Sequence, residues 1–182
     1  MLGGRVKKAN IELHDVRWVV GAKIEDTYET LRKDWFGSLK GLHIDSYKKI
    51  KYLDGYKINL RNVENFQISN NKSSYKTKTK KNLWFVNVGG YDPSSMQEKH
   101  EFGLVIAKNK LEAKNIAKSK WLIGYKKKHK DDIASLETLI SCNDCELIKK
   151  IDNWEIELTP NKNFMEENNY PDWYGYQKID ET

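Results

Sequence analysis

An internal repeat constrains the fold of this sequence more than any other feature. All four histidines pair at one offset, because His14 and His100 lie 86 residues apart and His43 and His129 lie 86 residues apart. The same offset relates five further matches: Gly3-Gly4 with Gly89-Gly90, Glu12 with Glu98, Asp15 with Glu101, Trp35 with Trp121, and Asp45 with Asp131. Self-similarity at a fixed spacing is the signature of a duplicated unit. We therefore expect two tandem copies of one fold.

The offset increases further along the chain. It becomes 98 where 53–60 matches 151–158, so the second copy contains an insertion of 12 residues near 133–144. The apolar residues of the insertion have helical spacing and predict a short added helix. Met1-Leu2 matches Asn87-Val88, the end of the apolar run that begins at Leu83. The opening strand of the first copy is therefore expected to be truncated.

Each copy is predicted to be a ββαββ unit. Runs rich in β-branched and aromatic residues at 16–20 and 102–106 indicate strands, and each precedes an amphipathic segment that ends in a tryptophan. Asn109 is expected to cap the second helix, with Glu112 at its third position. Asp54-Gly55 and Asp152-Asn153 predict hairpin turns. The Gly-Gly pairs and the His-x-Asp motifs are predicted to lie in loops.

The predicted fold class is α+β, with the two copies related by pseudo-two-fold symmetry around a shared core, since each copy is too small to bury its own sheet and helix well. The first repeat is assigned to 1–61 and the second to 83–158. Residues 62–82 are predicted to be an exposed linker, because they include the polar stretch KSSYKTKTKK. The C-terminal tail, 159–182, is expected to wrap around the protein or to add an edge strand.

Composition narrows the classes of protein that this chain can belong to. It has 38% hydrophobic and 32% charged residues, a mean hydropathy of -0.79, and no apolar run long enough to span a membrane. No secretory signal is recognisable, and two cysteines cannot build a disulfide framework, so a cytoplasmic location is expected. The net charge is +6, but only four of the 32 basic residues are arginines. Nucleic acid is therefore an unlikely partner.

The motifs themselves resemble a known family. The stretches MLGG, NIELHDVRWVVG, IEDTYETLRKDWFG, KGLHIDSY, LDGYKINL, LWFVNVGGYDP and HEFGLVIA are similar to a small bacterial family known only as a domain of unknown function, number fifteen forty-three. The resemblance covers nearly the whole chain outside the linker and the tail. It implies one or two copies of the family's unit and no particular activity. Family members have a few residues of strand before the Gly-Gly pair, which this chain lacks.

Histidines and carboxylates form the candidate site. Residues two apart share a face of an extended segment, which applies to Glu12 with His14 and to His43 with Asp45. The glycine pairs would allow backbone to approach an anion, although a plain turn is the alternative. The candidate ligand-binding residues are Glu12, His14, His43, Asp45, Glu98, His100, His129, Asp131, Gly3, Gly4, Gly89 and Gly90.

Several functions remain open for such a site. We expect a small protein that binds a small polar or anionic ligand, without a cofactor or an assigned metal. The alternatives are a metal-dependent hydrolase using zinc, manganese or iron, a nucleic-acid accessory protein, and a purely structural hydrogen-bond network. Familiar enzyme motifs are missing, so catalysis is left open. A homodimer through an open sheet edge is a further expectation.

The cysteines form a CxxC motif inside the insertion. Cys142 and Cys145 have no counterparts in the first copy, and no second CxxC exists to complete a structural zinc site. We expect two incidental thiols.

Overall fold

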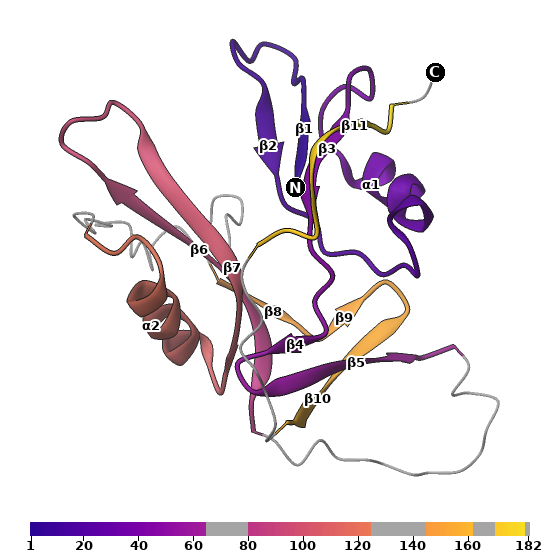
Figure 1. Ribbon diagram of the computed structural model, residues 1–182, viewed down its shortest axis with the longest axis vertical. Helices are drawn as coiled ribbons and strands as arrows, with labels where there is room; N and C mark the ends of the chain where they lie inside the picture. The colour runs from indigo at the N-terminus through magenta and orange to yellow at the C-terminus, as the bar shows by residue number, and fades with distance from the viewer. Residues whose placement is uncertain (65–79, 125–144, 162–169, 181–182) are drawn as a thin grey trace, which may run out of the picture. The chain divides into compact units, whose positions relative to one another are not determined.

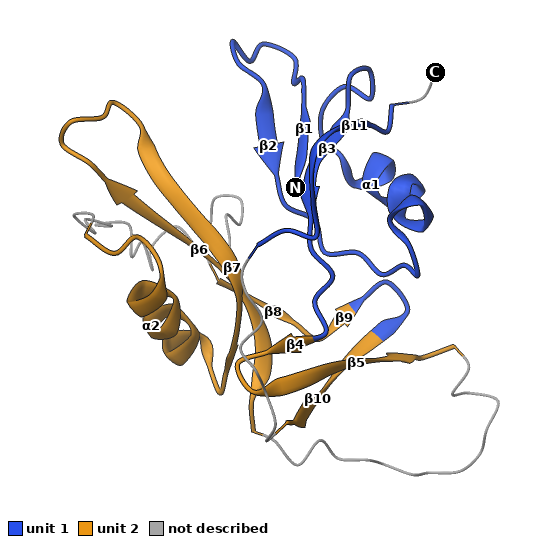
Figure 2. Ribbon diagram, viewed as in Figure 1, with its two compact units in different colours: residues 1–51, 151–154, 167–182 blue, residues 52–150, 155–166 orange. Residues whose placement is uncertain are grey.

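The computed structural model describes residues 1–64, 80–124, 145–161 and 170–180, and it combines short helices with antiparallel sheets (Figure 1). The chain forms two compact units (Figure 2). Unit 1 contains 1–51, 151–154 and 167–182, and unit 2 contains 52–150 and 155–166. Within the described residues, no helix is long and apolar enough to cross a membrane.

Unit 1 packs two short helices against a four-stranded sheet of order β11-β3-β1-β2. Its elements are β1 (Leu2–Gly4), β2 (Leu13–Asp15), the 3-10 helix η1 (Ile24–Thr27), α1 (Tyr28–Asp34), β3 (His43–Tyr47) and β11 (Trp173–Lys178). Leu2 and Ile44 are opposite one another on β1 and β3, and they are buried with Leu31 and Trp35 in one cluster. Apolar burial against α1 therefore occupies one face of this sheet.

Unit 2 contains a three-stranded sheet, β7-β6-β8, packed against the longer helix α2. A second sheet has the order β4-β5-β10-β9. The elements are β4 (Tyr52–Leu53), β5 (Tyr56–Asn62), β6 (Asn82–Tyr91), β7 (Glu98–Ala107), α2 (Lys110–Lys120), β8 (Cys145–Ile148), β9 (Lys150–Ile151) and β10 (Trp154–Pro160). The hairpin tip at 151–154 groups with unit 1 (Figure 2).

The predicted helix cap and hairpin turn are confirmed. The Asn109 side chain accepts a hydrogen bond from the backbone N–H of Glu112 at 2.9 Å, which caps α2. Asp54 and Gly55 have φ values of 48° and 79°, as a two-residue hairpin turn requires. Asp152 also has a positive φ, 49°, in the corresponding hairpin. The two hairpins meet in one sheet, in which β5 and β10 are neighbours.

The order of elements agrees between the two copies but is richer than predicted. Within the described residues of each copy, two strands precede a helix and three strands follow it, and β3 begins at His43, where a loop was predicted. His129 and Asp131 lie outside the described residues. The strand predicted at 16–20 is wrong: β2 ends at Asp15. Most of the buried apolar residues of the described chain form two clusters, one in each unit. One core shared by both copies stays a prediction.

The glycine pairs and the first His-x-Asp motif lie in strands and not in loops. Gly3 and Gly4 belong to β1, Gly89 and Gly90 belong to β6, and His43 starts β3. None of these four glycines has a positive φ. At Gly4 the missing side chain has a packing role, because a Cβ there would lie 2.8 Å from the Trp35 ring.

The compact units do not follow the predicted repeat boundaries. Unit 1 ends its first segment at residue 51, because the β4–β5 hairpin of the first copy groups with unit 2. The C-terminal tail does add an edge strand: β11 pairs antiparallel with β3, with an irregularity between Tyr174 and Gln177. The predicted insertion helix at 133–144 and most of the predicted linker lie outside the described residues.

Candidate functional site

The candidate residues of the first copy form a row across the sheet of unit 1. Gly3 on β1 lies opposite both His14 on β2 and His43 on β3, and Lys178 on β11 lies opposite His43. Directly opposite residues in an antiparallel sheet point to the same face. The row is therefore on the face away from α1, because the neighbouring residue Leu2 points into the core.

His43 is the buried centre of this row. Its side chain is 3% exposed, and its Nε2 lies 3.2 Å from Asp45 Oδ1 and 3.3 Å from Glu12 Oε1. A Cβ on Gly3 would lie 2.5 Å from the same Nε2, so only glycine leaves room for the imidazole. Gly3 therefore leaves the space that the His43 imidazole occupies.

Hydrogen bonding indicates the protonation state of His43. Its Nδ1 lies 2.9 Å from the carbonyl oxygen of Gly41, and a carbonyl can only accept, so Nδ1 carries a hydrogen. Its Nε2 faces two carboxylates, which also only accept. Both ring nitrogens of His43 therefore lie against acceptor oxygens, one of the backbone and two of side chains.

Asp45 links His43 to the second histidine. Its Oδ2 lies 3.5 Å from His14 Nε2, whereas its Oδ1 contacts His43. That Oδ2 atom is buried and has no hydrogen-bond partner. His14 is half exposed, at 51% of its side chain. Carboxylates and imidazoles thus alternate from Glu12 through His43 and Asp45 to His14.

One aromatic residue of the cluster was not identified from the sequence. The Tyr176 ring on β11 lies over the His43 ring, with centroids 4.1 Å apart and planes tilted by 35°. Tyr176 remains 60% exposed. The sequence led only to the expectation that the tail wraps around the protein or adds an edge strand. Its place beside His43 depends on the pairing of β11 with β3, which no local pattern encodes.

The second copy has a smaller cluster. His100 Nε2 lies 3.1 Å from Glu98 Oε2, and the Asn87 amide lies 3.3 Å from His100 Nδ1. Gly89 lies opposite His100, as Gly3 lies opposite His14. His129 and Asp131 lie outside the described residues.

On the side of β6 away from β7, the structure describes only part of the second copy. β8 begins at Cys145, which lies opposite Val86, so its described part runs along the first half of β6 and not beside Gly89. Cys145 is a buried free thiol, and Cys142 lies outside the described residues. The structure therefore brings together Glu12, His14, His43 and Asp45, and in the second copy only Glu98 with His100.

A metal site is not formed by these contacts. In the part of the chain that the structure describes, no group of three or more His, Cys, Asp or Glu side chains is arranged to hold a metal ion. The reason is visible in the first copy, where Asp45 uses a different oxygen for each histidine. The donors follow one another in a chain and do not surround one point.

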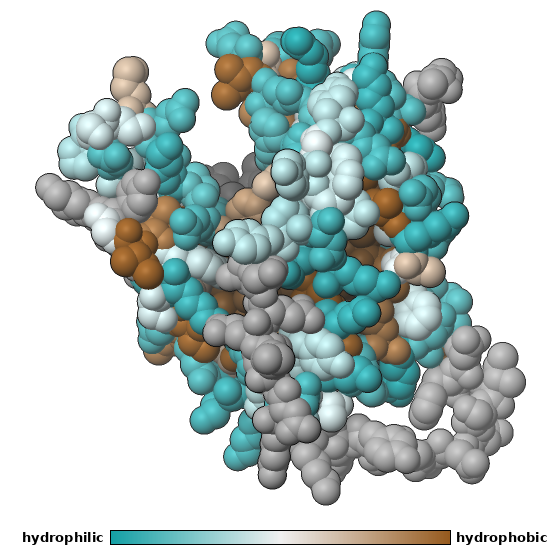
Figure 3. Space-filling view, in the orientation of Figure 1, coloured by the Kyte–Doolittle hydropathy of each residue, from teal (hydrophilic) through white to brown (hydrophobic). Residues whose placement is uncertain are grey.

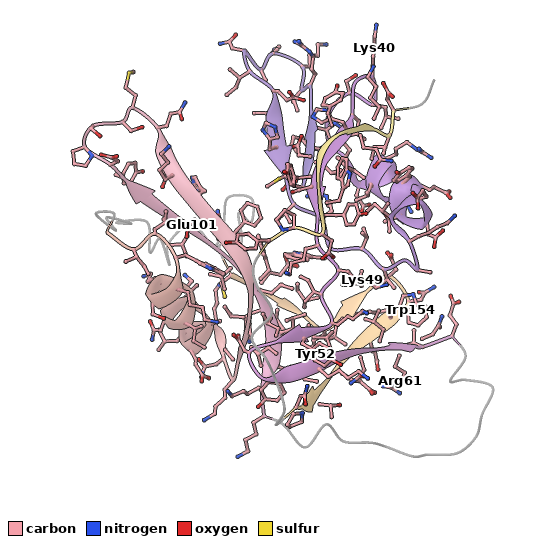
Figure 4. All side chains as sticks on the ribbon, in the orientation of Figure 1. Lys40, Lys49, Tyr52, Arg61, Glu101 and Trp154 are labelled. Carbon is pink, nitrogen blue, oxygen red and sulfur yellow. The ribbon has the colours of Figure 1, made fainter. Side chains whose placement is uncertain are left out.

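Arg61 and Glu101 make contacts that connect elements within unit 2. Arg61, which lies on β5 and is labelled in Figure 4, forms ion pairs with Glu155 and Glu157 of β10. Glu101 on β7 accepts a hydrogen bond from the backbone N–H of Leu122 at 2.8 Å. The face visible in Figure 3 is largely hydrophilic, with hydrophobic residues in scattered places.

Comparisons with known proteins agree with the repeat. Residues 9–60 and 95–158 match the sequence pattern of a family described as Domain of Unknown Function (DUF1543), so all four histidines of the sequence fall within matched segments. A crystal structure of the protein Il1583 from Idiomarina loihiensis is similar, with 29% sequence identity and a TM-score of 0.67. The similarity covers 99% of this chain and 94% of that one. No curated protein matches the sequence.

Proposed function

This chain belongs to the DUF1543 family, with two matched segments consistent with two tandem copies, and we propose that its first copy binds a small polar ligand at the Glu12–His14–His43–Asp45 cluster. The observation that carries the proposal is Asp45 Oδ2, a buried carboxylate oxygen without a hydrogen-bond partner. A buried polar atom without a partner is costly, and a ligand hydrogen would remove that cost.

The setting of this oxygen also supports a binding role. It lies between a buried imidazole and a half-exposed one. Glu12 and His14 are accessible enough to contact a ligand that arrives from solvent, with 42% and 51% of their side chains exposed.

A thermal-shift screen of small polar compounds tests the proposal. A ligand at about ten times its Kd should raise the free energy of unfolding by about 1.4 kcal/mol. The Asp45→Asn variant keeps the shape of the side chain and removes its charge, so it should abolish the shift. Glu98→Gln makes the same change in the second copy and should leave the shift intact. Equal loss in both variants, or none in either, would contradict the assignment to the first copy.

A metal-dependent hydrolase is the second candidate, and one observation favours it. The nitrogen-to-oxygen separations of 3.2, 3.3 and 3.5 Å resemble those between ligands on one zinc ion, whose bonds of about 2.0–2.1 Å place ligands about 3.3 Å apart. The carbonyl of Gly41 on His43 Nδ1 would orient that ligand. Asp45 would have to turn so that one oxygen faces both histidines. Stabilisation by zinc or manganese that a chelator reverses would support this candidate over the first.

We also propose a symmetry relation between the two copies, a cellular location and an oligomeric state. A pseudo-two-fold relation between repeats at 1–61 and 83–158 is supported by the matching order of elements and by the sheet order β4-β5-β10-β9, in which the hairpins of the two copies mirror one another. A cytoplasmic location and a homodimer through an open sheet edge remain proposals from the sequence. The oligomeric state is measurable by light scattering.

A further inference from the structure

A side-chain contact passes over β1 and joins the two strands that flank it. The sheet order is β11-β3-β1-β2, so His14 on β2 and Asp45 on β3 are not on neighbouring strands, yet His14 Nε2 lies 3.5 Å from Asp45 Oδ2. Two strands that flank a third are about 9.5 Å apart. The contact crosses at Gly3, where a Cβ would lie 3.0 Å from the same oxygen. A glycine at this position therefore leaves room for the contact.

The strand that carries His14 is short and lies at an edge. β2 has three residues and pairs with β1, which also has three, and it is the outer strand of this sheet in the described chain (Figure 1). Short edge strands open locally at a low cost in free energy. The contact between His14 and Asp45 connects β2 to β3, which the backbone pairing of β2 with β1 does not do.

The strength of this contact depends on the charge of His14. A neutral imidazole carries its hydrogen on one of two nitrogens, whereas the imidazolium always presents a hydrogen at Nε2 and has a charge opposite to that of a carboxylate. Asp45 Oδ2 has no hydrogen-bond partner and can accept this hydrogen. The His14 side chain is 51% exposed, so its proton exchanges with solvent. Histidine is the side chain whose charge ordinarily changes between about pH 5 and about pH 8.

We infer that the contact between His14 and Asp45 is a pH-sensitive latch, which fastens the edge strand β2 to β3 when His14 is protonated and releases it as the pH rises. The sign follows from linkage, because the fastened form holds the proton that the contact uses. A falling pH therefore favours the fastened form, and a rising pH removes its advantage. The latch acts without a ligand and so goes beyond the proposed function.

Other charged groups near the latch also bear on its pH dependence. They are His43 on β3, Glu12 before β2, Asp15 with its partner Arg17, the Met1 ammonium next to β1, and Lys178 on β11. Burial lowers the pKa of the Met1 ammonium, and the charges of Asp45 and Asp15 act in the opposite direction. A variant that changes only His14 leaves all these groups in place and therefore isolates the latch.

Hydrogen exchange of the full chain, without added ligand, tests the latch. Rates at about pH 5.5 and about pH 7.5, which lie on either side of the ordinary histidine value, are divided by the intrinsic rate of each amide at that pH. The paired amides of β1 and β2 should open about threefold less often at the lower pH, as expected for one exposed ion pair. The amides of α2 serve as the reference and should not show this difference.

Two matched variants complete the experiment. His14→Gln keeps a donor that does not titrate, so the exchange of β1 and β2 should no longer depend on pH. His100→Gln makes the same change in the second copy and should retain the threefold difference. A difference that persists in His14→Gln, a difference of opposite sign, or none in the protein without substitutions would overturn the latch. Each of these results leaves the proposed function standing, because the ligand screen with Asp45→Asn tests it separately. Circular dichroism establishes that each variant is folded.

Discussion

The two copies share their spacing of histidines and carboxylates, but the structure describes a cluster of four such residues in the first copy and one pair in the second. In the first copy, β1 has a strand on each side of Gly3, so His14 and His43 reach the same carboxylate of Asp45. In the second copy, the described partner of Gly89 is His100 on β7. The two-histidine cluster of the first copy thus depends on strands on both sides of the glycine, whereas His129 and Asp131 of the second copy lie outside the described residues.

The difference extends to burial and therefore to energy. The side chain of His43 is 3% exposed and that of His100 is 46% exposed. Exposed ion pairs contribute about 0–1 kcal/mol, whereas removal of the buried His43 side chain leaves a cavity and takes the partner from Asp45, whose side chain is 29% exposed. Removing the histidine is therefore expected to destabilise the protein more in the first copy than in the second.

The largest expected effect is that of His43→Ala. This substitution leaves Asp45 and Glu12 without their buried partner and should lower the free energy of unfolding by about 3 kcal/mol. His100→Ala should cost less than about 1 kcal/mol. Urea denaturation of both variants measures the contrast, and equal losses would show that the two clusters are equivalent.

Gly3→Ala should destabilise the protein by about 1–3 kcal/mol, because the new Cβ would lie 2.5 Å from His43 Nε2 and 3.0 Å from Asp45 Oδ2. The double variant Gly3→Ala/His43→Ala removes the clash together with the imidazole. Its loss of stability should be smaller than the sum of the two single losses. Strictly additive losses in the same urea experiments would mean that Gly3 does not make room for His43.

The helices offer a third contrast. The Asn109 side chain caps α2, whereas Thr27, at the start of α1, makes no side-chain cap bond and instead donates its hydroxyl to the carbonyl of Ile24. Asn109→Ala should therefore lower the free energy of unfolding by about 1 kcal/mol, and Asn109→Asp should preserve it. Hydrogen exchange in the first turn of α2 should accelerate in the alanine variant. Unchanged exchange would show that the cap contributes nothing.

The smallest expected effect concerns Asp92, which corresponds to Val6 in the first copy. The hydroxyl and backbone N–H of Ser94 donate to Asp92 and hold the pKa of its carboxyl below the ordinary value. A lower pKa in the folded state stabilises the protein above the unfolded pKa, and this contribution is lost as the pH falls through the folded pKa. Asp92→Asn should flatten the stability profile slightly between about pH 5 and about pH 2. A carboxyl that titrates by NMR at the ordinary value of about 3.9 would contradict this expectation.

Local signals predicted the features that depend on neighbouring residues. The cap at Asn109 and the turn at Asp54-Gly55 were predicted from the sequence because the necessary donors, acceptors and φ values lie within a few residues of one another. The repeat itself was predicted from spacing alone, and the family match at 9–60 and 95–158 agrees with it.

Features that depend on distant strands were missed or misplaced. The glycine pairs were assigned to loops because glycine is common in turns, whereas Gly3 and Gly4 lie in β1, where His43 and Trp35 approach the backbone closely. The apolar residues at 16–20 suggested a strand, yet they follow β2 without regular structure. Tyr176 entered the candidate site only through the pairing of β11 with β3.

The joint sheet of the two hairpins has a consequence for how the chain folds. β5 pairs with β10, and across this pair the Asn59 amide donates to the Thr159 hydroxyl, 100 positions further along the chain. A contact of such high sequence separation forms slowly, because a long loop must close before the pairing stabilises it. During synthesis the β4–β5 hairpin therefore waits with an open edge until most of the second copy has left the ribosome. Premature pairing of that edge with another nascent chain is the expected route to misfolding.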